Sequence, residues 1–429
     1  MVLDGKIIIV GGGIGGLTTA LYLKQYGIQS EIYEAATELK ELGVGINLFS
    51  HAMARLSELG LEAELRAVAV EPEQFCFFSR FGQLVYTEPA GLHAGYPVRH
   101  LSFHRAALHA VLLDAVRNRI GADAVRTGHR CIGIAQDDHA VEVYFEDGHG
   151  TPLSSVKADI VIGCDGIRSA VRRSLNPSEG GVAFGGINLW RGITVGPPVF
   201  GGRSAIRVGT VKTGKLVLYP IRDLPDGTQL LNWATEVQMN VRKENDWGTK
   251  GNIDDFIPYF ADWKFDWLDV PQLFAKSEFV LEYPMVDRDP IDRWTVGRVT
   301  LLGDAAHPMY PRGGNGGAQA IIDASVIAPL LASSADPRDA LAAYEADRRS
   351  KTTKIVLTNR TEPPDTIIDL VEARSKGKPF NRIEDIVRPE ELAAISEKYK
   401  RIAGYDLDST RARAAGDPDA RPLPSVHGP

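Results

Sequence analysis

The sequence predicts an α/β protein in which a parallel sheet is interrupted by a mostly antiparallel β segment. An apolar run at residues 7–10 is followed by a glycine turn, a helical pattern and a second strand-like run at 31–34, which together form a βαβ unit. From 181 to 295 Trp, Tyr and Phe become frequent, and prolines separate strand-like runs. The βαβ pattern resumes at 298–303, which indicates that the β segment is an insertion.

These changes of pattern divide the chain into four parts. They are a discontinuous α/β domain, a β-rich inserted domain, a C-terminal helical extension and a tail. We expect them to cover residues 1–180 with 296–360, residues 181–295 with part of 70–103, residues 361–404, and residues 405–429, respectively. The tail is rich in Arg, Asp, Ala and Pro and is expected to be disordered.

The composition is that of an ordinary soluble globular protein. Of 429 residues, 44% are hydrophobic and 24% are charged, and the net charge of −7 comes from well-mixed charges, which argues against a nucleic-acid surface. Cys76, Cys131 and Cys164 have neither disulfide nor metal-ligand spacing, so we expect a cytoplasmic protein without a metal site. The apolar run at 7–23 is glycine-rich and too short to cross a bilayer, so no membrane span is expected.

Periodicity predicts the remaining elements. Residues 104–119 carry one apolar stripe at helical spacing, and residues 141–145 alternate as a strand that stops at the turn Asp147-Gly148. Residues 158–163 have the pattern of a strand that is buried on both faces. Further strands are expected at 215–221 and 229–236, and helices from Gly316 onward, over 338–359 and over 389–401.

Five of the six residues 11–16 are glycine, spaced G-x-G-x-x-G between a strand and a helix. This spacing permits a tight turn and lets a pyrophosphate approach the helix N-terminus. Glu34 ends the second strand, where a carboxylate can accept hydrogen bonds from a ribose hydroxyl. An adenine dinucleotide is therefore expected; the alternative is a glycine-rich turn without a ligand. The expected contacts are Gly11, Gly13, Ile14, Gly15, Gly16 and Glu34.

That motif leaves NAD, NADP and FAD open, although Glu34 disfavours a 2′-phosphate by charge repulsion. A second group of motifs favours a flavin. Gly303-Asp304 stands at the end of the resumed strand, and after Pro311 the glycine-rich residues 312–317 open another helix. Asp304 as a helix N-cap is the alternative interpretation. His307 is interpreted as a structural residue near a helix start rather than as a catalytic one.

These motifs resemble those of the group A flavoprotein monooxygenases, the aromatic hydroxylases related to salicylate and p-hydroxybenzoate hydroxylase, over about residues 5–360. Residues 11–16 with Glu34 resemble the ADP site, Asp165-Gly166 resembles the D-G fingerprint linked to FAD and NAD(P)H, and Gly303-Asp304 resembles the third motif. Residues 283–290 and 309–311 are similar to the phenazine hydroxylase branch. The chain departs from these relatives at Arg312-Gly313, where salicylate hydroxylases have His-Gln, and over residues 359–405.

The resemblance implies a Rossmann-like, p-hydroxybenzoate hydroxylase-like FAD-binding domain, and hydroxylation of an electron-rich aromatic or N-heteroaromatic small molecule. NADPH or NADH would reduce the FAD, and O₂ would then form a flavin C4a-hydroperoxide that attacks the ring. Asp304 would hold the ribityl chain, with Pro311 and Gly313 near the isoalloxazine. The other implied cofactor contacts are Val44, Gly45, Arg105, Cys131, Asp165, Gly303, Gly314, Asn315, Gly316 and Gly317. For Arg105 the alternative is a solvated residue at a helix start.

Trp190, Arg191, Tyr219, Trp233 and Tyr283 are candidates to line an aromatic substrate pocket beside the flavin, with core packing as the alternative. No general base is identified. Other functions remain open: a Baeyer–Villiger-like oxygenase, a reductase, a two-component oxygenase, or a non-catalytic FAD- or NAD-sensing module. We expect the partner to be a small aromatic molecule and the protein to be a monomer or a homodimer.

Overall fold

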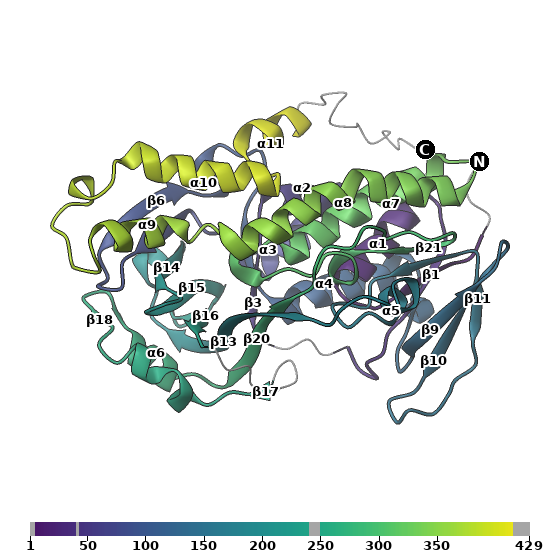
Figure 1. The fold of residues 1–429 in the computed structure, drawn as a ribbon, viewed down its shortest axis with the longest axis horizontal. Coiled ribbons are helices and arrows are strands. Elements are labelled where there is room, and N and C mark those ends of the chain that lie inside the picture. The colour runs from purple at the N-terminus through teal and green to yellow at the C-terminus, as the bar shows by residue number, and fades with distance from the viewer. Residues whose placement is uncertain (1–4, 40–42, 240–248, 415–429) are drawn as a thin grey trace.

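The computed structural model describes residues 5–39, 43–239 and 249–414. Two large sheets form its framework (Figure 1). In spatial order the five-stranded sheet contains β21 (Val299–Leu301), β12 (Ile160–Gly163), β1 (Ile7–Val10), β2 (Ser30–Tyr33) and β8 (Val125–Arg126). The eight-stranded sheet contains β17 (Thr249–Lys250), β20 (Val280–Asp287), β13 (Ala183–Gly196), β16 (Gln229–Gln238), β15 (Gly214–Asp223), β14 (Ser204–Thr210), β5 (Gln74–Phe78) and β6 (Leu84–Pro89).

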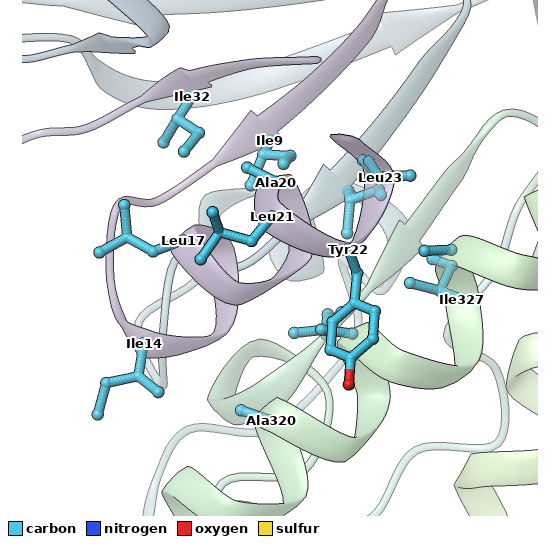
Figure 2. Close-up of a cluster of buried hydrophobic side chains, with 14 of the residues drawn as sticks. Ile9, Ile14, Leu17, Ala20, Leu21, Tyr22, Leu23, Ile32, Ala320 and Ile327 are labelled. Atoms are coloured by element: carbon cyan, nitrogen blue, oxygen red, sulfur yellow. The ribbon is translucent and has the colours of Figure 1, made fainter. Parts of the chain in front are cut away.

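The five-stranded sheet is entirely parallel, and β1 lies at its centre. Ile7, Ile8 and Ile9 are fully inaccessible, as an apolar strand covered on both faces requires. Helix α1 (Ile14–Gln25) follows β1 and packs against α7 (Gly316–Ser333) and α4 (Arg105–Arg119). Figure 2 shows α1 side chains between Ile9 and Ile32 of the strands and residues of α7. This packing confirms the predicted α/β fold class.

The eight-stranded sheet is antiparallel except where β14 runs parallel to β5. One of its faces carries an aromatic core that α6 (Val270–Ala275) helps to cover. The other face meets a three-stranded sheet of β3 (Gly45–Leu48), β7 (Leu101–His104) and β4 (Ala69–Val70). The second face therefore adjoins the strand that leads into α4, which begins at Arg105.

The C-terminal helices lie along one edge of the molecule, drawn in green-yellow to yellow in Figure 1. They are α8 (Pro337–Thr361), α9 (Thr366–Arg374), α10 (Pro389–Ala403) and α11 (Leu407–Ala414). The expectation of disorder from residue 405 is therefore wrong for 405–414. The Tyr405 ring stacks on Phe49 at 4.7 Å, and Arg411 Nε donates to Gly95 O, so tertiary contacts order this segment. Residues 415–429 lie outside the described residues.

Helix α7 is the one described helix that is long and apolar enough to cross a membrane. It is mostly buried against α1, α2 (Ser50–Glu58) and α8, as expected for a core helix of a globular protein. The remaining elements are α3 (Glu62–Ala67), α5 (Ala170–Leu175), the antiparallel sheet of β9 (Arg130–Gln136), β10 (Val141–Glu146) and β11 (Val156–Ala158), and the hairpin of β18 (Lys264–Phe265) and β19 (Leu268–Asp269). The domain limits given above remain predictions.

Candidate cofactor and substrate site

The first glycine turn is as tight as backbone packing allows. Gly11 has a φ of +109°, and a Cβ there would lie 2.4 Å from Cys164 O. A Cβ on Gly16 would lie 2.0 Å from Gly11 O, whereas a Cβ on Gly13 would meet no atom within 4 Å. The turn is thus closed toward the protein and open at Gly13, where the first backbone N–H groups of α1 lack intrahelical partners. This is a suitable site for a phosphate group.

Glu34 closes the turn from β2. Its Oε2 accepts from Gly12 N at 2.7 Å, and its Oε1 accepts from Ala36 N at 2.8 Å. Each carboxylate oxygen has a second lone pair, so the side chain can hold the turn and still accept a hydroxyl donor.

Asp304 and Arg105 share one electrostatic environment at the end of β21. The Asp304 side chain can be reached by solvent, but many protein atoms surround its carboxylate. These atoms partly desolvate the carboxylate and raise its pKa, while the nearby charges of His307 and Arg105 lower it. Gly303, with a φ of +61°, turns the chain so that Asp304 leaves the core. An accessible carboxylate opposed by positive charge is well suited to accept ligand hydroxyl groups.

His307 is held in the core through Asp323 of α7. Asp323 Oδ2 contacts His307 Nε2 at 2.6 Å and accepts from Gly303 N at 3.1 Å, and Asp323 Oδ1 accepts from Arg348 Nε at 2.6 Å. All three side chains are buried. The geometry places His307 in a structural role, anchoring the turn that presents Asp304.

Stability at low pH should depend on Asp323. Burial alone would raise its pKa, but His307 and Arg348 outweigh burial and lower the pKa to about 2. Because the folded-state pKa is below that of an unfolded Asp, the carboxylate stabilises the fold above about pH 4, and this stabilisation is lost as the pH falls toward 2. Asp323→Asn is expected to lower the unfolding free energy at pH 7 by about 3–5 kcal/mol, because it breaks a buried pair.

Thermal unfolding at pH 7 and at pH 3.5 or below would test this expectation. The difference between wild type and variant should shrink in acid. The control Asp347→Asn removes an exposed carboxylate of α8 that pairs with Lys351 and should change little. An equal deficit at both pH values would contradict the role given to the Asp323 charge.

The Asp165-Gly166 stretch caps α5. Asp165 accepts from Ser169 Oγ at 2.5 Å and from Ala170 N at 2.7 Å, and burial raises its pKa. Cys131 lies near it on β9; burial and the Asp165 charge raise the pKa of the Cys131 thiol to about 12. Cys131 is thus a neutral thiol rather than a nucleophile.

Sequence reasoning missed Arg172 of α5, which joins the Asp165-Gly166 stretch to the residues that follow Asp304. Its buried guanidinium donates from Nη1 to Ala305 O at 3.0 Å and to Ala306 O at 2.9 Å, and pairs with Glu179. A basic residue three positions after the Ser169 N-cap was visible in the sequence, but its partners more than 130 positions away were not.

The second glycine-rich stretch forms a short turn, Pro311–Gly313, and Gly314 follows with a φ of +66°. The residues from Pro311 to Asn315 are called the ring loop below. Asn315 is completely buried, and its Nδ2 donates to Gly313 O at 3.1 Å, so its side chain holds the ring loop. The ring loop runs directly into the N-terminus of α7, which begins at Gly316.

The eight-stranded sheet meets β3 at Gly45. Gly45 N donates to Asn232 Oδ1 at 2.6 Å, and Arg191 Nη2 donates to Gly45 O at 2.5 Å. A Cβ at Gly45 would lie 2.8 Å from Tyr219 Cε2, and Tyr283 packs in one cluster with Val44. Arg191, Tyr219 and Tyr283, three of the five candidates for the substrate pocket, therefore converge on residues 44–45.

Trp190 and Trp233 do not join them, and their assignment to the pocket is corrected. Both are fully buried in the aromatic core on the opposite face of the sheet. Successive strand residues point to opposite faces, so Trp190 cannot share a face with Arg191. Trp233 pairs with Gly192, two positions after Trp190, and its Nε1 donates to Ser277 Oγ at 2.7 Å.

On the face that meets β3, four paired residues form a half-exposed row across the central strands. Arg191 of β13 pairs with Ala234 of β16, Ala234 pairs with Val217 of β15, and Val217 pairs with Arg207 of β14. At one end Arg191 touches Gly45; at the other, Arg207 Nη1 contacts Arg312 O of the ring loop at 3.5 Å. This row, called the arginine row below, spans the distance between the two loops expected beside a flavin ring.

Comparison with known proteins agrees with this geometry. A family model described as FAD binding domain matches residues 4–195 and 274–359. A phenazine 1,6-dicarboxylic acid hydroxylase, PhzS of Lysobacter antibioticus, is 41% identical over 403 residues, which cover 92% of this chain and 96% of that protein. The chain belongs to the group A FAD-dependent aromatic hydroxylases.

Other members of these hydroxylases are more distant. A 3-hydroxybenzoate 6-hydroxylase of Klebsiella oxytoca is 31% identical over 365 residues, covering 83% of this chain and 87% of that protein. The crystal structure of Klebsiella pneumoniae HpxO with FAD and uric acid superposes with a TM-score of 0.74 at 25% identity, covering 96% of this chain and 98% of that one. This hydroxylase therefore uses FAD, with NAD(P)H and O₂ as co-substrates.

The residues of this FAD-dependent hydroxylase fit the cofactor. The Gly13 opening could accept a phosphate, the accessible Asp304 carboxylate could accept hydroxyl groups, and the ring loop that leads into α7 could lie beside the ring of FAD. Within the described residues, no group of three His, Cys, Asp or Glu side chains is placed to hold a metal ion.

Proposed function

We propose that this chain hydroxylates a planar N-heteroaromatic carboxylic acid of the phenazine class, using FAD, O₂ and NADH or NADPH. The arginine row carries this proposal, because it combines a guanidinium at each end with small apolar side chains between them. Three strand spacings of about 4.8 Å separate the end residues by about 14 Å, room for three fused rings. The 41% identity to a phenazine dicarboxylic acid hydroxylase supports the same substrate class.

We assign FAD contacts as the sequence predicted, with two refinements. The backbone N–H groups at Gly13, Ile14 and Gly15 would bind the pyrophosphate and Glu34 the ribose, while Asp304, beside Arg105, would bind the ribityl hydroxyls. The buried Asn315 would hold the ring loop, and Cys131 and Asp165 would shape the wall behind the cofactor.

Bound FAD supplies the redox chemistry and activates O₂. The protein contributes charge and shape around it. The positive end of the α7 dipole at Gly316 and Gly317 would stabilise negative charge on the reduced ring, and the close contact of Gly45 with Asn232 would exclude water from that side. The arginine row would orient the substrate carboxylate.

The two arginines of the row differ in what neutralises them. Arg207 Nη1 donates to Asp365 Oδ1 at 2.7 Å, so its charge is already paired. Arg191 donates only to Gly45 O and the Tyr219 hydroxyl, its Nε is buried without a partner, and no carboxylate of the described residues forms an ion pair with it. We therefore assign Arg191 as the residue that binds the substrate carboxylate.

Arg191→Met is expected to raise KM for an aromatic acid about 10- to 150-fold, the equivalent of a charge-assisted hydrogen bond of about 1.5–3 kcal/mol. KM for the corresponding neutral amide should change less than threefold, because that substrate brings no charge to the site. The control Arg222→Met removes an exposed arginine of β15 and should leave both KM values unchanged. Equal losses for acid and amide would contradict the assignment.

The function as a whole is tested by NAD(P)H oxidation with phenazine, quinoline and benzoate acids, followed by product mass. A gain of one oxygen atom in a phenazine acid is the expected result. NAD(P)H oxidation without an oxygenated product would favour a reductase, and activity only after adding a separate reductase would favour a two-component oxygenase. We further propose that the enzyme acts in the cytoplasm, as a monomer or homodimer.

A further inference from the structure

The ring loop is held from outside by a helix that no motif singled out. Tyr399 of α10 is buried, and its Oη accepts from Asn315 Nδ2 at 3.1 Å and donates to Asn359 Oδ1 at 2.7 Å. A Cβ on Gly313 would lie 1.5 Å from the same Oη, so the hydroxyl occupies the space beside Gly313. One phenol thus contacts two positions of the ring loop and a third residue on α8.

The donors and acceptors in this network have a single consistent assignment. Gly313 O can only accept, so the Asn315 amide must direct its Nδ2 toward it. The same Nδ2 reaches Tyr399 Oη, which leaves the hydroxyl proton of Tyr399 for Asn359 Oδ1. Asn359 in turn donates from Nδ2 to Tyr310 O at 3.3 Å, immediately before the ring loop.

Other contacts of the C-terminal helices act on the same stretch. Gln319 of α7 donates from Nε2 to Ala403 O at 3.2 Å, and Arg312 Nε lies 3.9 Å from Asp365 Oδ2. Phe49, on which Tyr405 stacks, would lie 3.3 Å from a Cβ on Gly314. The stretch from Tyr310 to Gln319 is therefore held by residues 359–405.

We propose that Tyr399 is a positioning residue for the flavin ring, acting through Asn315 and Gly313. It fixes the backbone of the ring loop so that the free N–H groups at the start of α7 face the ring and stabilise its reduced, anionic form. This inference rests on the proposed placement of FAD at the ring loop. Residues 362–414 would then support the cofactor site rather than only extend the fold.

The test is Tyr399→Phe in the full-length holoenzyme, measured by hydrogen exchange and by the midpoint potential of the bound FAD. Backbone amides in a peptide covering 310–318 should exchange faster in the variant. Reduced FAD should bind about tenfold more weakly relative to oxidised FAD, which for a two-electron couple makes the potential about 30 mV more negative. Asn359→Ala, which removes the acceptor of the same hydroxyl, should shift both readouts in the same direction.

The matched control is Ser396→Ala. Ser396 of α10 donates from Oγ to Glu88 Oε2 of β6 at 2.7 Å, so this variant also removes one hydroxyl contact of the same helix, but not a contact to the ring loop. Unchanged exchange and potential in Tyr399→Phe, or an equal shift in Ser396→Ala, would overturn the proposal. Wild-type protein whose 310–318 amides gain no protection on binding FAD would instead refute the placement of the flavin.

Discussion

Protein carrying Gly16→Ala is expected to emerge from purification without FAD. The new Cβ would lie 2.0 Å from the backbone oxygen of Gly11, a contact that no side-chain rotation can relieve. The turn between β1 and α1 must then open, at a cost of roughly 1–3 kcal/mol or more for an overpacked core. Flavin absorbance per chain should fall to near zero, and the melting temperature should fall with it.

Gly13→Ala is the matched variant that separates folding from cofactor binding. A Cβ at this position meets no protein atom within 4 Å, and its φ of −75° suits alanine. The FAD-free protein should therefore melt at the wild-type temperature, while affinity for FAD falls at least tenfold because the methyl group occupies the space assigned to the pyrophosphate. Unchanged FAD affinity in Gly13→Ala would show that the phosphate lies elsewhere.

Asp304→Ala is expected to weaken FAD binding about 10- to 150-fold. The variant loses a charge-assisted acceptor for the ribityl hydroxyls, worth about 1.5–3 kcal/mol. Because the side chain is accessible and makes none of the hydrogen bonds that hold the turn, the fold should persist. The dissociation constant can be measured by fluorescence as FAD is added back to the stripped protein.

The control for Asp304 is Asp292→Ala, an exposed carboxylate that precedes β21 and lies outside the cofactor site. It should bind FAD as the wild type does. Asp304→Asn should fall between wild type and the alanine variant, because the amide keeps an acceptor but loses the charge. Equal affinity in all three proteins would remove Asp304 from the ribityl contact.

The elements around the cofactor were predictable because local sequence determines them. The fully apolar run of β1, the glycine turn and the carboxylate of Glu34 lie within 28 consecutive positions, from 7 to 34, and each has its own backbone or burial requirement. The same holds for Gly303, whose positive φ places Asp304 outside the core. His307 was correctly interpreted as structural, although its partner Asp323 was not foreseen.

What could not be predicted depends on contacts between distant segments. Tyr399 and Asn315 are 84 positions apart, and Arg172 reaches carbonyls more than 130 positions away, so no local pattern marks them. The error at Trp190 had a different origin. Strand alternation shows that Trp190 and Arg191 lie on opposite faces, but only the contact between Arg191 and Gly45 shows which face meets β3.

Because Tyr399 lies late in the chain, its position determines when during synthesis the flavin site can be completed. A nascent polypeptide can form the βαβ unit at its N-terminus early, but β21 and the ring loop leave the ribosome only after all strands of the eight-stranded sheet, and α10 follows later still. Capture of the flavin is therefore expected near the end of translation. A product that stops before α10 would contain every recognisable FAD motif and yet lack Tyr399, which we propose positions the ring, so that only a nearly complete chain is expected to become a competent flavoprotein.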